Sequence, residues 1–115
     1  AARFCMISDS LRPAGLPDGE YLSGGQPVTV KDGKAHLSDG TIAGSASNLY
    51  DGLRKAISFG IPEEDVVRAC TYNPACSLGV QDQVGSIATG ALADFIVCRS
   101  DYTGRRVFMG GRELV

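Results

Sequence analysis

The sequence lacks tryptophan, contains one histidine, and has no excess of charge of either sign. Its 11 basic and 13 acidic side chains give a net charge of −2, and the basic residues are scattered. A nucleic-acid-binding surface needs clustered basic residues, so the composition argues against such a partner. No apolar run approaches the roughly 18 residues of a membrane span, and no signal peptide precedes the first expected strand. We therefore expect a cytoplasmic protein with neither nucleic acid nor membrane as a partner.

The sequence also lacks cysteine and histidine residues at the spacing typical of metal ligands. The four cysteines, Cys5, Cys70, Cys76 and Cys98, show no Cys-x-x-Cys pair, and three of them lie in apolar patterns where a small thiol packs well. We expect reduced cysteines rather than disulfides or metal ligands. The histidine, His36, has no second ligand at a suitable spacing, whereas a catalytic zinc usually has three protein ligands plus water. The chain is thus expected to hold no metal site of its own.

The length sets a further limit. With 115 residues the chain can form one domain with a modest core. It is too short for a (β/α)8 barrel, which typically needs about 250 residues. It begins Ala1-Ala2-Arg3 rather than with methionine, so we expect it to be part of a larger enzyme.

The stretch from Phe4 to Ser10 is the main candidate for a functional element. Four apolar residues precede Ser8-Asp9-Ser10, and such a run suits a strand buried on both faces. In parallel α/β folds, catalytic side chains stand at the C-terminal ends of strands. Asp9 stands there and is our candidate catalytic carboxylate. The alternative is that Asp9 only stabilises a turn, because aspartate is common where strands become loops.

Period-two alternation predicts two hairpins. Residues 27–31 and 34–37 alternate around Asp32-Gly33, a pair that favours a type I′ turn. Residues 106–109 and 112–115 flank Gly110-Gly111 in the same way. Further strands are expected at 20–22 and, buried, at 94–98.

Helical periodicity begins at Ser47, which we expect to be the N-cap of a helix that ends at Gly60. Pro62 is expected to start a second helix, because proline is tolerated at the first helical position. This helix should stop at Asn73, since the following proline disfavours the helical conformation there. A short helix over 74–78 should follow.

Three segments carry a family resemblance: Ile7-Ser8-Asp9-Ser10, Gly40-Thr41-Ile42-Ala43-Gly44-Ser45-Ala46, and Asn73-Pro74-Ala75 through Leu78-Gly79. With them, nearly the whole chain resembles the C-terminal portion of the N-acetylglucosamine-6-phosphate deacetylase family, within the amidohydrolase superfamily. The segment 85–94 resembles a wider superfamily signature. The deacetylases more often have Thr-Asp-Ala where this chain has Ser-Asp-Ser at 8–10.

The resemblance implies an α/β fold: the C-terminal fragment of a (β/α)8 amidohydrolase barrel plus strands of a small β-sandwich. By itself the chain would be α+β. Residues 1–79 would form the end of the catalytic barrel, with a β-hairpin insertion and helices, and Asp9 would end the last barrel strand. Residues 80–115 would supply the C-terminal strands of the small β-sandwich domain.

The resemblance also implies a function, the metal-dependent hydrolysis of N-acetylglucosamine 6-phosphate to glucosamine 6-phosphate and acetate. Asp9 would be the proton-transfer residue, and Ile42, Ala43 and Gly44 would contact the sugar. A divalent metal, zinc or iron, would be held by a Glu and two His upstream of this chain, and the intact enzyme would be a homodimer. This chain alone would be inactive.

Two alternatives stay open. One is another amidohydrolase, such as a deaminase or cyclic amidase, that shares the signature at 85–94. The other is a non-enzymatic α+β module for binding or assembly.

Overall fold

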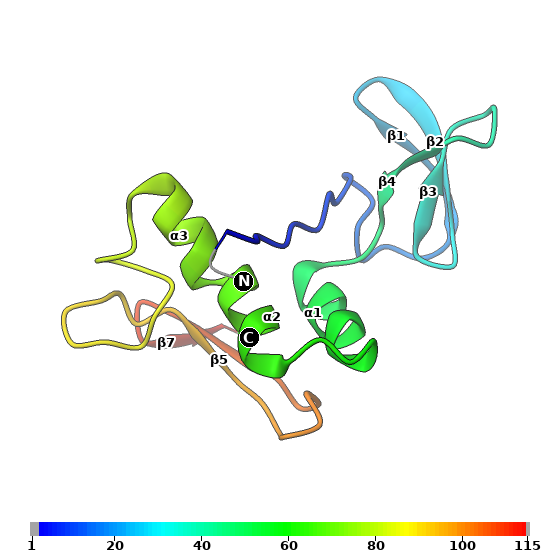
Figure 1. Cartoon of the computed structure of the whole chain (residues 1–115). Helices are drawn as coiled ribbons and strands as arrows, with labels where there is room; N and C mark the ends of the chain where they lie inside the picture. The colour runs from blue at the N-terminus through cyan, green and yellow to red at the C-terminus, as the bar shows by residue number, and fades with distance from the viewer. Residues whose placement is uncertain (1–2, 115) are drawn as a thin grey trace. The chain divides into compact units, whose positions relative to one another are not determined.

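The computed structural model of this chain describes residues 3–114. The chain divides into two compact units, one of Ala1–Met6 with Ile57–Val115 and one of Ile7–Ala56. Figure 1 labels its helices and most of its strands. The predicted division after residue 79 concerns the intact protein and stays a prediction.

The unit Ile7–Ala56 contains an antiparallel meander. Strands β1 (Gly19–Ser23), β2 (Gln26–Lys31), β3 (Lys34–His36) and β4 (Ile42–Ser45) lie side by side in the order of the sequence (Figure 1). The predicted hairpin is the β2–β3 pair and is therefore confirmed. Strand β4 was not predicted, because its four residues show no clear alternation.

The turn between β2 and β3 has the predicted geometry. Asp32 and Gly33 both adopt positive φ angles, 50° and 72°. A type I′ turn requires positive φ at both central residues, and its twist matches that of the flanking strands.

Small side chains form the core of this unit. Val30, Ala35 and Ala46 are buried together, and Leu11 and Tyr21 pack against them. Burial alternates along β2, as expected for a strand with one face on the core. The loop after Asp9 is thereby attached to the sheet through Leu11.

Within the described chain alone, residues 4–7 are not buried, and the expectation that they form a buried strand of the intact barrel stays a prediction. Phe4 is 50% exposed and Ile7 is 80% exposed. Both sheets of the described residues are antiparallel and are built from other segments. A strand is buried on both faces only when neighbouring strands and covering helices flank it, and residues 3–114 provide no such strands beside this run.

Helix α1 (Leu49–Ser58) begins one residue later than predicted. The side-chain oxygen of Asn48 accepts a hydrogen bond from the backbone N–H of Asp51 at 3.0 Å, so Asn48 is the N-cap rather than Ser47. The predicted end is confirmed, because Gly60 has a φ of 85°.

Helices α2 (Glu63–Cys70) and α3 (Tyr72–Leu78) replace the predicted helices over 62–73 and 74–78. The break comes at Thr71, three residues before the proline. Pro74 lies in the first turn of α3, where its missing N–H costs no helical hydrogen bond. Gly79 ends α3 in the left-handed conformation.

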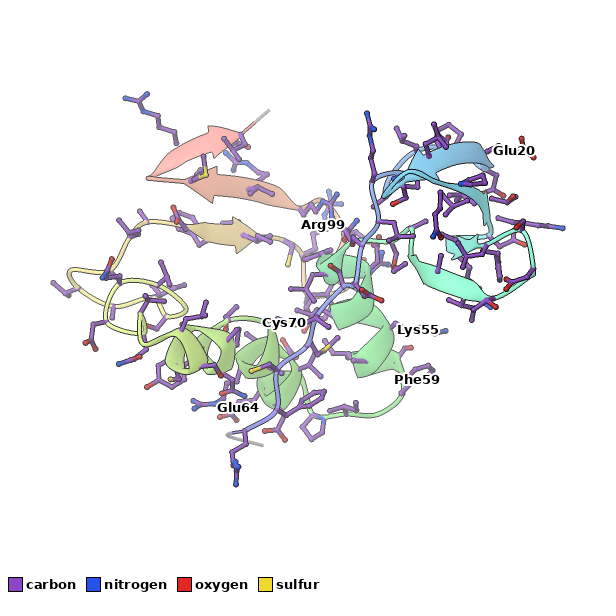
Figure 2. The ribbon with its side chains drawn as sticks, turned by 90° about the horizontal axis from the view of Figure 1, so that it is seen from above. Glu20, Lys55, Phe59, Glu64, Cys70 and Arg99 are labelled. Carbon is purple, nitrogen blue, oxygen red and sulfur yellow. The ribbon has the colours of Figure 1, made fainter. Side chains whose placement is uncertain are left out.

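The extended segment at the start of the described chain is attached to α2 and α3. The backbone N–H of Met6 donates to the Ala69 carbonyl at 2.9 Å, and the Asn73 side chain donates to the Phe4 carbonyl at 2.7 Å. Cys70, labelled in Figure 2, places its sulfur 3.8 Å from that of Met6. Asn73 is 3% exposed and its hydrogen bond to the half-exposed Phe4 is partly buried.

Replacing Asn73 by alanine should therefore lower the free energy of unfolding by about 0.5–1.5 kcal/mol, the net contribution of its side-chain hydrogen bond to the Phe4 carbonyl. Urea unfolding measures this loss. The exposed Gln83→Ala variant is the control and should change the free energy by less than about 0.5 kcal/mol. Equal effects of the two variants would contradict a structural role for the Asn73 amide.

The second sheet lies in the other unit. Strands β5 (Phe95–Val97), β6 (Arg106–Met109) and β7 (Arg112–Leu114) are antiparallel, with the predicted turn between the last two. The rings of Phe95 and Phe108 stack at 4.7 Å between centroids. The predicted last residue of this hairpin, residue 115, lies outside the described residues.

The expectation that residues 94–98 form a buried strand was wrong in part. Ile96 and Val97 are 47% and 46% exposed, because β5 is an edge strand of a three-stranded sheet. Asp94 has a structural contact across the hairpin: its carboxylate accepts the backbone N–H of Gly110 at 2.7 Å.

Two simpler predictions can be compared with the structure. All four cysteines are free, as expected for reduced thiols. Within residues 3–114, no helix is long and apolar enough to cross a membrane.

Candidate active site

Asp9 and the segment 42–44 lie beside each other, although more than thirty residues separate them in the sequence. The backbone N–H of Ser45 donates to the Asp9 carbonyl, and the backbone N–H of Leu11 donates to the Ser45 carbonyl, both at 2.9 Å. Ser10 and Ser45 thereby form an isolated parallel bridge. The structure thus brings together the two segments that sequence reasoning had selected separately.

Asp9 has an unusual backbone. Its φ is 48°, in the left-handed region that few residues other than glycine adopt. Aspartate tolerates this region better than most residues, but the conformation still has to be held by its surroundings. Such conformations cluster at functional sites. The Asp9 side chain is exposed.

Gly44 allows the close approach of β4 to Asp9. A Cβ atom at this position would lie 2.9 Å from Cγ of Leu11 and 3.1 Å from the carbonyl oxygen of Asp9. Contacts this short require the neighbouring atoms to move, and one of them is backbone. A glycine is therefore needed for contact between β4 and the chain around Asp9.

Three serines connect the same region. The Ser10 hydroxyl donates to the Ser47 carbonyl at 2.6 Å. The hydroxyls of Ser45 and Ser47 lie 2.7 Å apart, and the Ser47 N–H donates to the Ser45 hydroxyl at 3.0 Å. Sequence reasoning missed this network. The departure at Ser10 from the more common alanine was the one available signal.

Ile42 and Ala43 complete the predicted substrate-binding segment. Ile42 is 65% exposed and faces His36 in the β3–β4 register, whereas Ala43 is half-buried. The turn before them is ordered by Asp39, whose carboxylate accepts the backbone N–H of Thr41 at 2.9 Å. That hydrogen bond holds the pKa of Asp39 below its usual value. Because Ile42 is exposed and the turn before it is already ordered, its side chain can contact a ligand without rearrangement of the sheet.

An open hollow of about 610 Å³ lies on the same unit and was not predicted. It is lined by Arg12 and Glu20 with apolar side chains that include Leu16 and Leu22, and Figure 2 labels Glu20 on β1. Asp9 is not among its lining residues.

The described residues do not fit a metal site of their own. No three His, Cys, Asp or Glu side chains gather within residues 3–114. A catalytic zinc usually needs three protein ligands. A metal near Asp9 would therefore need ligands from other parts of a larger protein.

Comparison with known proteins identifies the family. Residues 29–114 match the Amidohydrolase family. The chain belongs to this family. Among its relatives, the N-acetylglucosamine-6-phosphate deacetylase of Vibrio furnissii is 34% identical over 112 residues, which are 96% of this chain and 28% of the relative. The Bacillus subtilis enzyme of the same name is 39% identical over 102 residues, 88% of this chain and 26% of the relative.

Solved structures of N-acetylglucosamine-6-phosphate deacetylases also match this chain. The N-acetylglucosamine-6-phosphate deacetylase of Pasteurella multocida matches 99% of this chain and 30% of its own, with a TM-score of 0.91 and 29% identity. A mutant of the Mycobacterium smegmatis enzyme, in complex with N-acetyl-D-glucosamine-6-phosphate, matches 98% of this chain and 31% of its own, with a TM-score of 0.86 and 30% identity.

This amidohydrolase chain thus spans less than a third of the length of these relatives. The resemblance to N-acetylglucosamine-6-phosphate deacetylases, inferred from the sequence, is confirmed. The comparisons assign no role to single residues, so the roles of Asp9 and of residues 42–44 stay predictions.

Proposed function

We propose that this chain is the C-terminal part of an amidohydrolase that converts N-acetylglucosamine 6-phosphate and water to glucosamine 6-phosphate and acetate. The relatives named above carry this activity in their names. The observation that carries the proposal is the position of Asp9. Its strained backbone rests against Gly44 and Ser45, in one of the three segments that carry the resemblance to the deacetylases.

In this proposal, residues 4–9 form the last strand of the barrel in the intact protein. Exposed Phe4 and Ile7 support this, because a barrel strand buries such side chains against neighbouring strands and helices. Residues 1–79 belong to the barrel with its hairpin insertion, and residues 80–115 belong to the small β-sandwich domain. The intact protein is a cytoplasmic homodimer.

Asp9 is the proton-transfer residue. As a carboxylate it accepts a proton from the water that attacks the acetamide carbonyl. As a carboxylic acid it then donates this proton to the amine nitrogen while the C–N bond breaks. One carboxyl group can serve both steps, because the proton that it gains in the first step is lost in the second, which returns Asp9 to the carboxylate form. A divalent metal, zinc or iron, belongs to the intact enzyme with ligands outside this chain, and the steps given to Asp9 are proton transfers only.

Strand β4 contacts the sugar. It is the last strand in the sheet order: it pairs with β3 on one side, and on the other side its last residue, Ser45, bridges to Ser10. Ile42 is exposed there and offers an aliphatic surface for the apolar face of a sugar ring. The backbone of Ala43 and Gly44 is the second part of this proposed contact.

Measuring acetate release by the intact protein tests the proposal. N-acetylglucosamine 6-phosphate should be hydrolysed with a kcat/KM at least about 100-fold above that for the ring opening of cyclic amides, which is measured separately. The reason is that a site built to hydrogen-bond one polar substrate rejects analogues that leave the polar groups of the site unpaired. The isolated chain should release no acetate.

Two outcomes would contradict the deacetylase. Hydrolysis of a cyclic amide or deamination, without acetate release, would favour another amidohydrolase. No hydrolysis of any kind, together with a cooperative melt of the isolated chain as a monomer, would favour a binding module.

A further inference from the structure

We infer that Gly44 and Ser10 are positioning residues for Asp9: Gly44 by its missing side chain, and Ser10 by its hydroxyl. This inference rests on the proposed function, because it concerns the same carboxylate. The proposed sugar contact uses the backbone of Gly44, whereas this inference concerns its missing side chain. The structure connects Gly44 to Asp9 itself, through atoms that a side chain would displace.

The backbone on both sides of Ser10 is held by one residue. Ser45 donates its N–H to the Asp9 carbonyl and accepts the N–H of Leu11, each at 2.9 Å. Asp9 needs such restraint because its φ of 48° is unfavourable for a residue with a side chain. The direction of the Asp9 side chain is set by that backbone angle. Any change that separates Ser45 from Asp9 would therefore redirect the carboxylate.

Gly44 controls this separation. The Cβ position at Gly44 points toward Leu11 Cγ at 2.9 Å and the Asp9 carbonyl oxygen at 3.1 Å, and not into open space. An alanine would have to push the Asp9 backbone away by a few tenths of an ångström. Catalytic groups are sensitive to shifts of this order, since a misplacement of about 1 Å can cost about 100-fold in rate.

Ser10 adds a second restraint that follows Asp9 directly. Its hydroxyl donates to the Ser47 carbonyl at 2.6 Å, and Ser47 is bound in turn to the Ser45 hydroxyl. The connection from Ser10 through Ser47 to Ser45 closes a ring of hydrogen bonds around the contact that holds Asp9. The more common alanine at this position would lack the bond from Ser10.

The test uses the intact protein with four variants. Gly44→Ala should lower kcat by at least about tenfold with KM within about twofold of wild type, because the added Cβ would point toward Leu11 and Asp9, whereas the proposed sugar contact at Gly44 is made by its backbone. Ser10→Ala should lower kcat by about threefold, and Ser10→Thr, which keeps the hydroxyl, should restore it. Gly25→Ala is the control, because Gly25 also has a positive φ, 80°, but has no atom within 4 Å of its Cβ position.

A rise in KM with unchanged kcat in Gly44→Ala would overturn the inference in favour of direct sugar contact. Equal losses in Gly25→Ala would overturn it as well. If Gly44→Ala does not fold, the Ser10→Ala and Ser10→Thr pair decides, since Ser10 is exposed.

Amide hydrogen exchange at Ser45 separates this inference from the deacetylase proposal. The Ser45 N–H donates to Asp9, so its exchange should be at least about threefold faster in Ser10→Ala and unchanged in Gly25→Ala. This readout needs no substrate. Unchanged exchange in Ser10→Ala would overturn the inference even where the enzyme is active, and faster exchange would support it even where this sugar is not the substrate.

Discussion

Replacing Asp9 by asparagine in the intact protein is expected to lower kcat by about 10²–10⁴-fold, the contribution of a positioned general acid–base group. Asparagine has nearly the shape of aspartate but can neither accept the proton of the attacking water nor return it to the amine. It also tolerates a positive φ, so the backbone at 48° should survive the change. Steady-state acetate release measures the effect.

Asp101→Asn is the matched control for this variant. Asp101 is also an exposed aspartate, and its carboxylate accepts the backbone N–H of Thr103 at 2.9 Å, so both variants replace an exposed carboxylate by an amide. The control should keep kcat within about twofold of wild type. Full turnover in Asp9→Asn would refute the role of Asp9, and equal losses in both variants would point to a loss of folded protein.

Gly85→Ala should give the largest loss of stability, about 2–5 kcal/mol. Its φ is +88°, and a Cβ atom there would lie 2.9 Å from both the Thr71 carbonyl oxygen and the Ala75 Cβ. The variant therefore combines a left-handed backbone, about 1–2 kcal/mol, with overpacking, about 1–3 kcal/mol. Thermal or urea unfolding measures the change in the free energy of unfolding.

Gly90→Ala separates these two causes. Gly90 has nearly the same φ, +90°, but has no atom within 4 Å of its Cβ position. It should therefore lose only the backbone part, about 1–2 kcal/mol. Equal losses at Gly85 and Gly90 would contradict the packing of Gly85 against α3.

Local signals allowed much of the fold to be predicted. The Asp32-Gly33 turn, the hairpin around Gly110-Gly111 and the left-handed helix ends at Gly60 and Gly79 all depend on neighbouring residues. Each follows from the backbone freedom of glycine within a few residues of a periodic segment. Such features can be predicted without knowledge of distant parts of the chain.

Features that depend on distant partners were predicted poorly. Residues 4–7 resemble a buried strand, but burial requires neighbours that residues 3–114 do not provide. Strand β4 was missed because it is held by β3 and by the chain around Asp9, not by its own alternation. The cap of α1 shifted from Ser47 to Asn48 because Ser47 hydrogen-bonds Ser45 instead.

In the candidate site, too, local features were predicted and contacts between distant residues were not. Asp9 was selected from its position after an apolar run, and residues 42–44 from a family resemblance. Neither argument predicted that the two would be in contact. The restraint by Gly44 and Ser10 could be found only from atomic positions, because it depends on a Cβ that is missing and on one hydroxyl bond.

The most direct test of the central claim is a calorimetric titration of the intact Asp9→Asn protein with N-acetylglucosamine 6-phosphate. If Asp9 transfers protons and does not hold the sugar, this variant should bind the substrate with a Kd within about threefold of the wild-type KM, and acetate should form at least about 10²-fold more slowly than with the wild type. A variant that fails to bind the sugar phosphate, or that binds it and releases acetate at the wild-type rate, would contradict the account.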